Sequence, residues 1–167
     1  GVVAFNYTHL LSKINFAVKN TTDASATNYR FVLTSAKLTN TYQSADYDVN
    51  ADTWAPDATM REFDLENLTI NSNATQYHSK EVLLIPGSAV GVYVKAEIQA
   101  TANGGTTWKK VSEVKKTFTN VLGKTGETPN VLVANNAYHF AVSLGVGTPI
   151  QFTATLSSWD DEGDVDA

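Results

Sequence analysis

Three histidines, His9, His78 and His139, are the side chains best suited to acid–base or metal chemistry near neutral pH. A hydrolase needs such a base within hydrogen-bonding reach of its nucleophile. His139 falls on the outward side of a predicted strand, His9 lies at a predicted bulge, and His78 opens a strand without an evident partner. No pair of them has the spacing of zinc ligands. We therefore expect no metal, and a hydrolase only if His9 or His78 lies beside a carboxylate in a cleft.

Carboxylates gather near the C-terminal end, in segment 160–166 (DDEGDVD). Several oxygens around a glycine could bind calcium, but the spacing does not follow the twelve-residue calcium loop and no glutamate closes it. A solvated, mobile acidic tail over 160–167 is the simpler interpretation. Gly145-Val146-Gly147 is followed by neither a third glycine nor a helix, so it predicts a turn and not a phosphate site. No cofactor is expected.

Aromatic residues are the remaining candidates for a binding site. Tyr47 and Trp54 lie in an irregular segment, 43–56, which is predicted as a loop or an edge hairpin, and Trp108 begins a later strand. Flat rings exposed in loops can stack on sugars, as in a glycan-binding β-sandwich. Covering the edges of sheets is the simpler role for the same rings, and both interpretations remain open.

The elements that must position these groups belong to one β-rich domain. The chain has 167 residues, 43% of them hydrophobic and 17% charged, which is enough to bury a core without metals or disulfides. A formal charge of -5 leaves no basic stripe for nucleic acid. The lack of cysteine excludes thiolate zinc sites and a cysteine nucleophile. No apolar run reaches the roughly 18 residues of a transmembrane segment.

Apolar and polar residues alternate along most of the chain, which is typical of β-strands. Segment 90–100 is the clearest case, and its apolar face predicts core; Asn-Gly-Gly at 103–105 then predicts a hairpin. Along 29–42 the apolar side changes between Leu33 and Ala36, which predicts a β-bulge.

The same alternation predicts further strands over 2–7, 14–18, 60–65, 68–70, 79–87, 106–119, 138–144 and 149–159. In strand 106–119, Lys110 and Lys116 share a side, which indicates a bulge or an edge position. The last two strands should bury Tyr138, Phe140, Val142, Leu144, Ile150, Phe152, Ala154 and Leu156. No segment has the apolar repeat of a helix, so seven or more strands predict an all-β, two-sheet Greek-key sandwich over 1–159.

Three segments, in order, resemble parts of the fimbrillin-like pilins of the Bacteroidetes type (type V). Segment 5–20 (FNYTHLLSKINFAVKN) places an aromatic, a histidine and a short apolar run before an alternating strand. Segment 79–87 (SKEVLLIPG) ends in Ile-Pro, and segment 135–161 (NNAYHFAVSLGVGTPIQFTATLSSWDD) is similar to the closing hairpin with its terminal tryptophan. Together the three resemblances span nearly the whole chain.

The resemblance implies a transthyretin-like β-sandwich that is exported as a lipoprotein. It also implies assembly into surface fimbriae after a protease removes an N-terminal segment, with outer-membrane anchoring through segments that this chain does not contain. Removal of one strand leaves an apolar groove, and a strand of another subunit fills it by adding to the sheet edge. The expected partners are other fimbrial subunits, and such a role needs no enzyme activity.

Two departures from the family pattern affect these expectations. The lipidated cysteine and the usual N-terminal domain are absent, so the chain is expected to be a processed or trimmed piece, or a short relative. Arg30 and Arg61 lie inside the predicted sandwich, where neither suits processing. The acidic segment 160–167 would make a poor donor strand because its charges would be buried. This favours an accessory, tip or terminal subunit.

The leading hypothesis is thus a non-enzymatic structural or adhesive subunit of a cell-surface fimbria. The alternative is a surface glycan-binding module that uses Tyr47, Trp54 and Trp108, and a host or microbial glycan or protein is a further possible partner. A strand joint is expected at the alternating apolar residues of the first and last strands, although packing in the core is the simpler role for all six. These six residues are Val3, Phe5, Tyr7, Ile150, Phe152 and Leu156.

Overall fold

A computed structural model describes residues 8–23, 28–71, 74–78, 80–102, 105–122 and 131–159. Within these ranges the chain forms strands and no α-helix. The strands are β1 (Ser12–Asn20), β2 (Tyr29–Tyr42), β3 (Ala45–Asp48), β4 (Thr53–Pro56), β5 (Met60–Asp64), β6 (Thr69–Asn71), β7 (Thr75–Tyr77), β8 (Val82–Leu84), β9 (Gly91–Ala100), β10 (Lys109–Phe118), β11 (Asn136–Leu144) and β12 (Gln151–Ser158). The predicted strand at 2–7 and the predicted tail at 160–167 lie outside the described residues.

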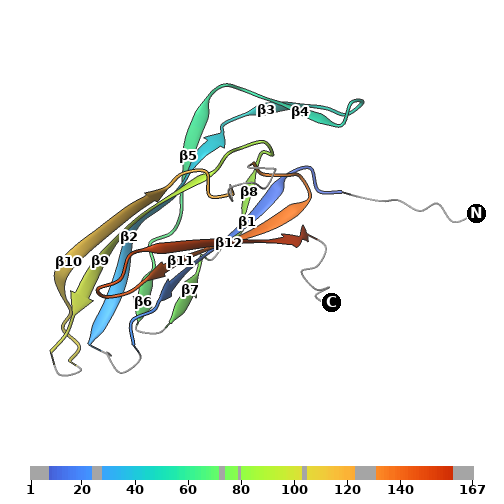
Figure 1. Cartoon of the computed structure of the whole chain (residues 1–167). Helices are drawn as coiled ribbons and strands as arrows, with labels where there is room; N and C mark the ends of the chain where they lie inside the picture. The colour runs from blue at the N-terminus through green and yellow to red at the C-terminus, as the bar shows by residue number, and fades with distance from the viewer. Residues whose placement is uncertain are drawn as a thin grey trace, which may run out of the picture.

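Two five-stranded sheets make the body of the molecule (Figure 1). We name them sheet A and sheet B. Sheet A has the order β12-β11-β1-β7, and β8 pairs with the other half of β1. Sheet B has the order β10-β9-β2-β5, and β6 also pairs with β2. The predicted all-β, two-sheet sandwich is confirmed.

Sheet A joins distant parts of the chain. β1 runs parallel to β11, with Ile14 opposite Tyr138 and Val18 opposite Val142. A parallel pair requires a crossover connection, and here all of sheet B is built from the residues between the two strands. β12 then returns antiparallel to β11 and ends this side of sheet A.

The core lies between the two sheets, where their inward side chains meet. The period-two face of β9 is buried as predicted, with Val92 and Val94 fully inaccessible. Phe16 of β1 and Phe140 of β11 supply aromatic rings from sheet A. Tyr138, Val142 and Leu144 are buried as well, so the predicted inward face of this strand is confirmed.

The irregularities read from the sequence also occur. The register of β2 against β9 shifts between Leu33 and Ser35, where the apolar side changes. β10 lies at an edge of sheet B and also has a register shift, between Lys110 and Ser112. Segment 43–56 forms the β3–β4 hairpin, a separate two-stranded sheet that projects from the sandwich (Figure 1).

One expectation was wrong. Leu156 was expected to face the core, but it is 61% exposed, whereas Phe152 is half-buried. Among the described strands β12 has a neighbour on one side only. The cover from sheet B, Phe118 packed on Phe152 at 5.4 Å, lies at the other end of β12.

Candidate functional site

The edges of β10 and β12 lie on the same side of the sandwich and are the long edges of the two sheets. The rings of Phe118 and Phe152, one from each edge strand, have centroids 5.4 Å apart. The opposite edges are made of shorter strands, β5 and β6 in sheet B and β7 and β8 in sheet A. β10 and β12 are therefore the two edges long enough to pair with a strand of a partner.

The edge of β12 has none of the usual protection against pairing. Its eight residues, QFTATLSS, include no charge and no proline. Native proteins commonly place lysine, proline or a bulge on an exposed edge to prevent another strand from adding to it. The exposed Leu156 and the half-buried Phe152 continue the apolar inner face of sheet A to this edge. β12 can thus offer both backbone groups and apolar side chains to an incoming strand.

The edge of β10 is protected by lysines and by a β-bulge. Its sequence, KKVSEVKKTF, carries four lysines, and the register shift after Lys110 leaves Val111 57% exposed. A bulge and lysine side chains both hinder the addition of an unselected strand. The two long edges therefore differ in chemistry: β12 is open and apolar, and β10 is cationic.

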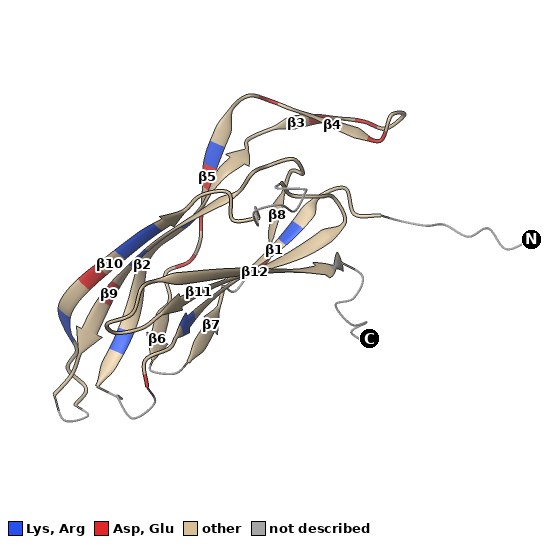
Figure 2. Cartoon of the chain, in the orientation of Figure 1, with Lys and Arg blue, Asp and Glu red and all other residues tan. Residues whose placement is uncertain are grey.

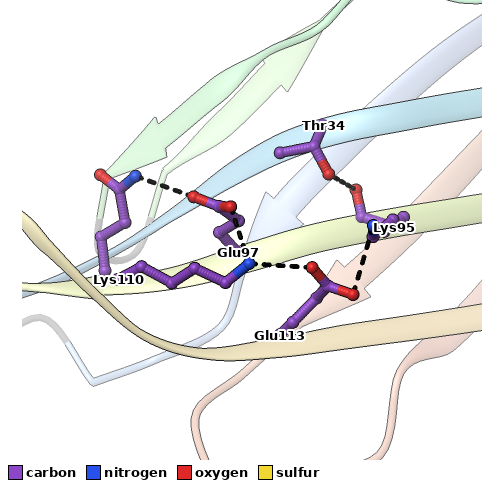
Figure 3. Close-up of polar contacts among 6 residues, drawn as sticks. Thr34, Lys95, Glu97, Lys110 and Glu113 are labelled. Carbon is purple, nitrogen blue, oxygen red and sulfur yellow. Dashed lines mark hydrogen bonds and ion pairs between the residues drawn. The ribbon is translucent and has the colours of Figure 1, made fainter.

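Part of the charge on β10 is neutralised on the outer face of sheet B (Figure 3). The Nζ of Lys110 lies 2.9 Å from a carboxylate oxygen of Glu97 and 2.9 Å from one of Glu113. Lys95 approaches the other oxygen of Glu113 at 3.3 Å. The hydrogen bonds to Glu97 and then Glu113 raise the pKa of Lys110, and the hydrogen bond from Lys110 lowers the pKa of both carboxyl groups.

The substitution Lys110→Met is expected to destabilise the fold slightly, and only in a defined pH window. Because the pKa of Glu97 and Glu113 lies below 4.5 in the folded state, their contribution is present above pH 4.5 and is lost as the pH falls through the lowered values. The raised pKa of Lys110 means that its contribution is lost only when the pH rises above 10.5. Urea midpoints measured from pH 3 to 8 should differ from wild type at neutral pH and converge in acid. Lys115→Met, which removes no ion pair of the described residues, is the control and should show no such pH-dependent gap.

The predicted glycan-stacking residues do not form one platform. Tyr47 and Trp54 face each other across the β3–β4 hairpin with ring centroids 5.0 Å apart. The indole Nε1 of Trp54 donates to the backbone oxygen of Leu10 at 3.1 Å, which holds the hairpin against the chain before β1. Trp108 directly precedes β10, and the Arg30 guanidinium lies 4.5 Å from the centroid of its ring. The β9–β10 connection and the β3–β4 hairpin lie at opposite ends of the molecule (Figure 1). Glycan binding stays a prediction, limited to one or other of these places.

The histidines have structural partners. His9 stacks on Trp159, with ring centroids 3.9 Å apart and planes at 11°. The His78 ring contacts the backbone of Lys80, and His139 interacts with Asn15 and Ser157. In the described part of the chain neither His9 nor His78 lies beside a carboxylate, and no three possible metal ligands gather there.

Sequence reasoning missed the contact between the two ends of the described chain. The His9 ring stacks on the Trp159 ring, and the ammonium of the buried Lys13 lies 5.4 Å from the centroid of the Trp159 ring. His9 also donates its backbone N–H to the side chain of Asn135 at 3.0 Å. The residues are far apart in sequence and share no periodic pattern, so no local signal could have found this contact.

Two packed sheets built from the described strands, with no α-helix among them, define the class of all-β sandwich proteins. The model of the fimbrillin-like family matches residues 1–159, and the chain belongs to that family. The resemblance noted in the sequence is confirmed. A comparison with curated proteins found no match.

Solved structures share the fold at low sequence identity. A fimbrial protein from Bacteroides vulgatus ATCC 8482 aligns with a TM-score of 0.61 and 17% identity, over 91% of this chain and 55% of that one. A candidate cell adhesion protein from Bacteroides uniformis ATCC 8492 aligns with a TM-score of 0.55 and 17% identity, over 94% and 53%. One from Parabacteroides distasonis ATCC 8503 aligns with a TM-score of 0.54 and 15% identity, over 91% and 52%. The chain thus spans about half the length of these structures.

Family membership indicates a non-enzymatic structural subunit with a cell-surface location, as the sequence predicted. Across the ranges that the structure describes, no helix is long and apolar enough to cross a membrane.

Proposed function

We propose that the chain is a structural or adhesive subunit of a cell-surface fimbria and joins its neighbours by strand addition at β12. The observation that carries the proposal is the uncharged, eight-residue edge of β12 beside a protected β10. The names of the similar solved structures, one fimbrial and two of candidate adhesion proteins, support the same role. Anchoring of the fimbria at the outer membrane is part of the same proposal.

The chemistry of the edge supports this role. An added strand gains backbone hydrogen bonds along β12, and its alternate side chains cover the apolar groups that the sandwich leaves exposed. Leu156 and the half-buried Ile150 and Phe152 are these groups. Their predicted place in a strand joint is therefore part of the proposal. Val3, Phe5 and Tyr7, the other predicted joint residues, lie outside the described part of the chain.

Lysines placed on β12 should abolish incorporation into fimbriae. The variant Thr153→Lys/Thr155→Lys adds two charges to exposed positions of this edge, and an incoming strand would have to pair beside them. We expect immunogold electron microscopy of cells that produce the labelled variant to show about tenfold less label on fimbriae than wild type, because lysines on an edge strand hinder the addition of another strand. The melting temperature should change little because both side chains are exposed.

A matched control separates the edge from a general effect of charge. Thr117→Lys adds a lysine to an exposed position of β10, which already carries four. This variant should enter fimbriae as wild type does. Normal incorporation of the folded β12 variant would rule out β12 as the joint.

A further inference from the structure

The edge of β10 carries positive charge that the described residues compensate only in part. We call Lys109, Lys110, Lys115 and Lys116 the lysine edge; all four are exposed. Lys110 is bound by Glu97 and Glu113. For the other three lysines, no carboxylate of the described residues lies within 4.0 Å. The strand also has no neighbour on its outer side among the described strands.

The β3–β4 hairpin has the opposite charge. Segment 43–59 contains Asp46, Asp48, Asp52 and Asp57, all exposed, and neither lysine nor arginine. These carboxylates accept hydrogen bonds from polar groups of the hairpin itself, such as Tyr47 on Asp52 and Ser44 on Asp57. None of the four forms an ion pair with a described cation. Figure 2 shows these acidic positions along a hairpin that stands clear of the sandwich.

The hairpin is held in place to present this charge. Tyr47 packs against Trp54 across the two strands, and Trp54 is bonded to Leu10. Because successive side chains of a strand alternate, Asp46 and Asp48 share the side of β3 opposite to Tyr47. Among the described residues no ion pair joins the hairpin to β10 within one molecule. The two charged surfaces are therefore available to different molecules.

We propose that the lysine edge of β10 docks the acidic β3–β4 hairpin of a second copy of this chain. Lysines directly opposite lysines repel, so they prevent two β10 edges from pairing. An acidic strand converts the same charges into attraction, so the lysine edge selects its partner by charge. The contact joins two different surfaces and is therefore heterologous, the kind that continues into open chains of subunits. It is separate from the joint at β12, and its place in a fibre rests on the assembly role proposed above.

Salt dependence is the first expected property of this contact. Single exposed ion pairs are weak and are screened by salt, so the association should be visible at high protein concentration and low ionic strength. Sedimentation velocity at about 200 μM protein should show oligomers in about 20 mM NaCl, and the association constant should fall about tenfold or more in 500 mM NaCl. A wild-type chain that sediments as a monomer under both conditions would overturn the proposal.

Charge reversal on each surface tests the pairing directly. Lys115→Glu/Lys116→Glu changes the lysine edge, and Asp46→Lys/Asp48→Lys changes the hairpin. Each variant alone should associate much more weakly than wild type, because its substituted positions no longer have the sign opposite to that of the other surface. An equimolar mixture should associate again, since the reversed edge of one variant then meets the reversed hairpin of the other, and the two unreversed surfaces also meet with opposite signs. Recovery in the mixture would also show that both variants are folded. Failure to recover would contradict the contact.

Two controls isolate the contact from net charge and from the joint at β12. Lys19→Glu/Lys80→Glu makes the same change in net charge at exposed positions elsewhere, and it should associate as wild type does. Thr153→Lys/Thr155→Lys should keep the salt-sensitive association although it loses the strand joint. Loss of association in either control would overturn the assignment to β10, and loss in the second would assign the association to β12.

Discussion

Replacing Phe140 by alanine is expected to lower the free energy of unfolding by about 3–5 kcal/mol, the usual cost of removing a buried phenylalanine. Phe140 is 1% exposed and lies in the middle of β11, between β1 and β12. The centroid of its ring lies 5.4 Å from that of Phe152, in an edge-on arrangement, and 6.4 Å from that of the tilted Tyr138 ring. The space left by the ring cannot be refilled without moving strands of both sheets. Guanidinium denaturation followed by fluorescence and circular dichroism would measure the loss.

The matched control is Val111→Ala. Val111 is 57% exposed at the bulge of β10, so its truncation should change the free energy of unfolding by no more than about 0.5 kcal/mol. A cost for Phe140→Ala that is no larger than this would contradict the packing of the core between the sheets.

The second large effect is expected at Gly91, where β9 begins. A Cβ at this position would lie 2.5 Å from the Thr39 Oγ1 and 2.9 Å from the backbone oxygen of Phe118. Both approaches are shorter than a carbon normally tolerates, and the backbone of Phe118 cannot rotate away as a side chain could. Gly91→Ala should therefore cost about 1–3 kcal/mol, as overpacking of a well-filled site does. Thermal unfolding monitored by circular dichroism would measure it.

Gly147 provides the contrast. It has a φ of 75° but no heavy atom within 4 Å of a Cβ placed on it. Asparagine tolerates this left-handed conformation better than most residues. Gly147→Asn should therefore be much less destabilising than Gly91→Ala. If the two variants unfold alike, crowding by β2 and β10 is not what requires glycine at position 91.

The amino-acid pattern predicted the local features well because burial on a pleated strand imposes a period of two. The alternating apolar residues from Val90 to Ile98 are the ones that are buried in the core. The change of apolar side after Leu33 coincides with the register shift of β2. β7 was not predicted because all three of its residues are exposed, so they show no alternation of buried and exposed positions. The place of Leu156 was misjudged for a related reason, since alternation indicates a side of the strand and not whether anything covers that side.

Pairing partners were beyond the reach of the pattern. Nothing in the alternation of β1 indicates that its neighbour is β11, more than a hundred residues away, or that the pair is parallel. The contrast between the edges of β10 and β12 depends on this order of strands. The candidate joint at Ile150, Phe152 and Leu156 could be named from the sequence, but the reason to prefer it, an edge without charge, needed the sheet order.

The direction of the strands in sheet A has a mechanical consequence. Because β1 is parallel to β11 and β12 is antiparallel to it, the start of β1 and the end of β12 meet at one end of the sheet, where His9 stacks on Trp159. Tension applied through these two points would peel strands apart one hydrogen bond after another. Tension transmitted through a partner strand paired with β12 would instead load all the hydrogen bonds between these two strands at the same time. Resistance to rupture is governed by the rate of unfolding under load, so the same sandwich would be weak when pulled by its ends and strong when pulled through its edge.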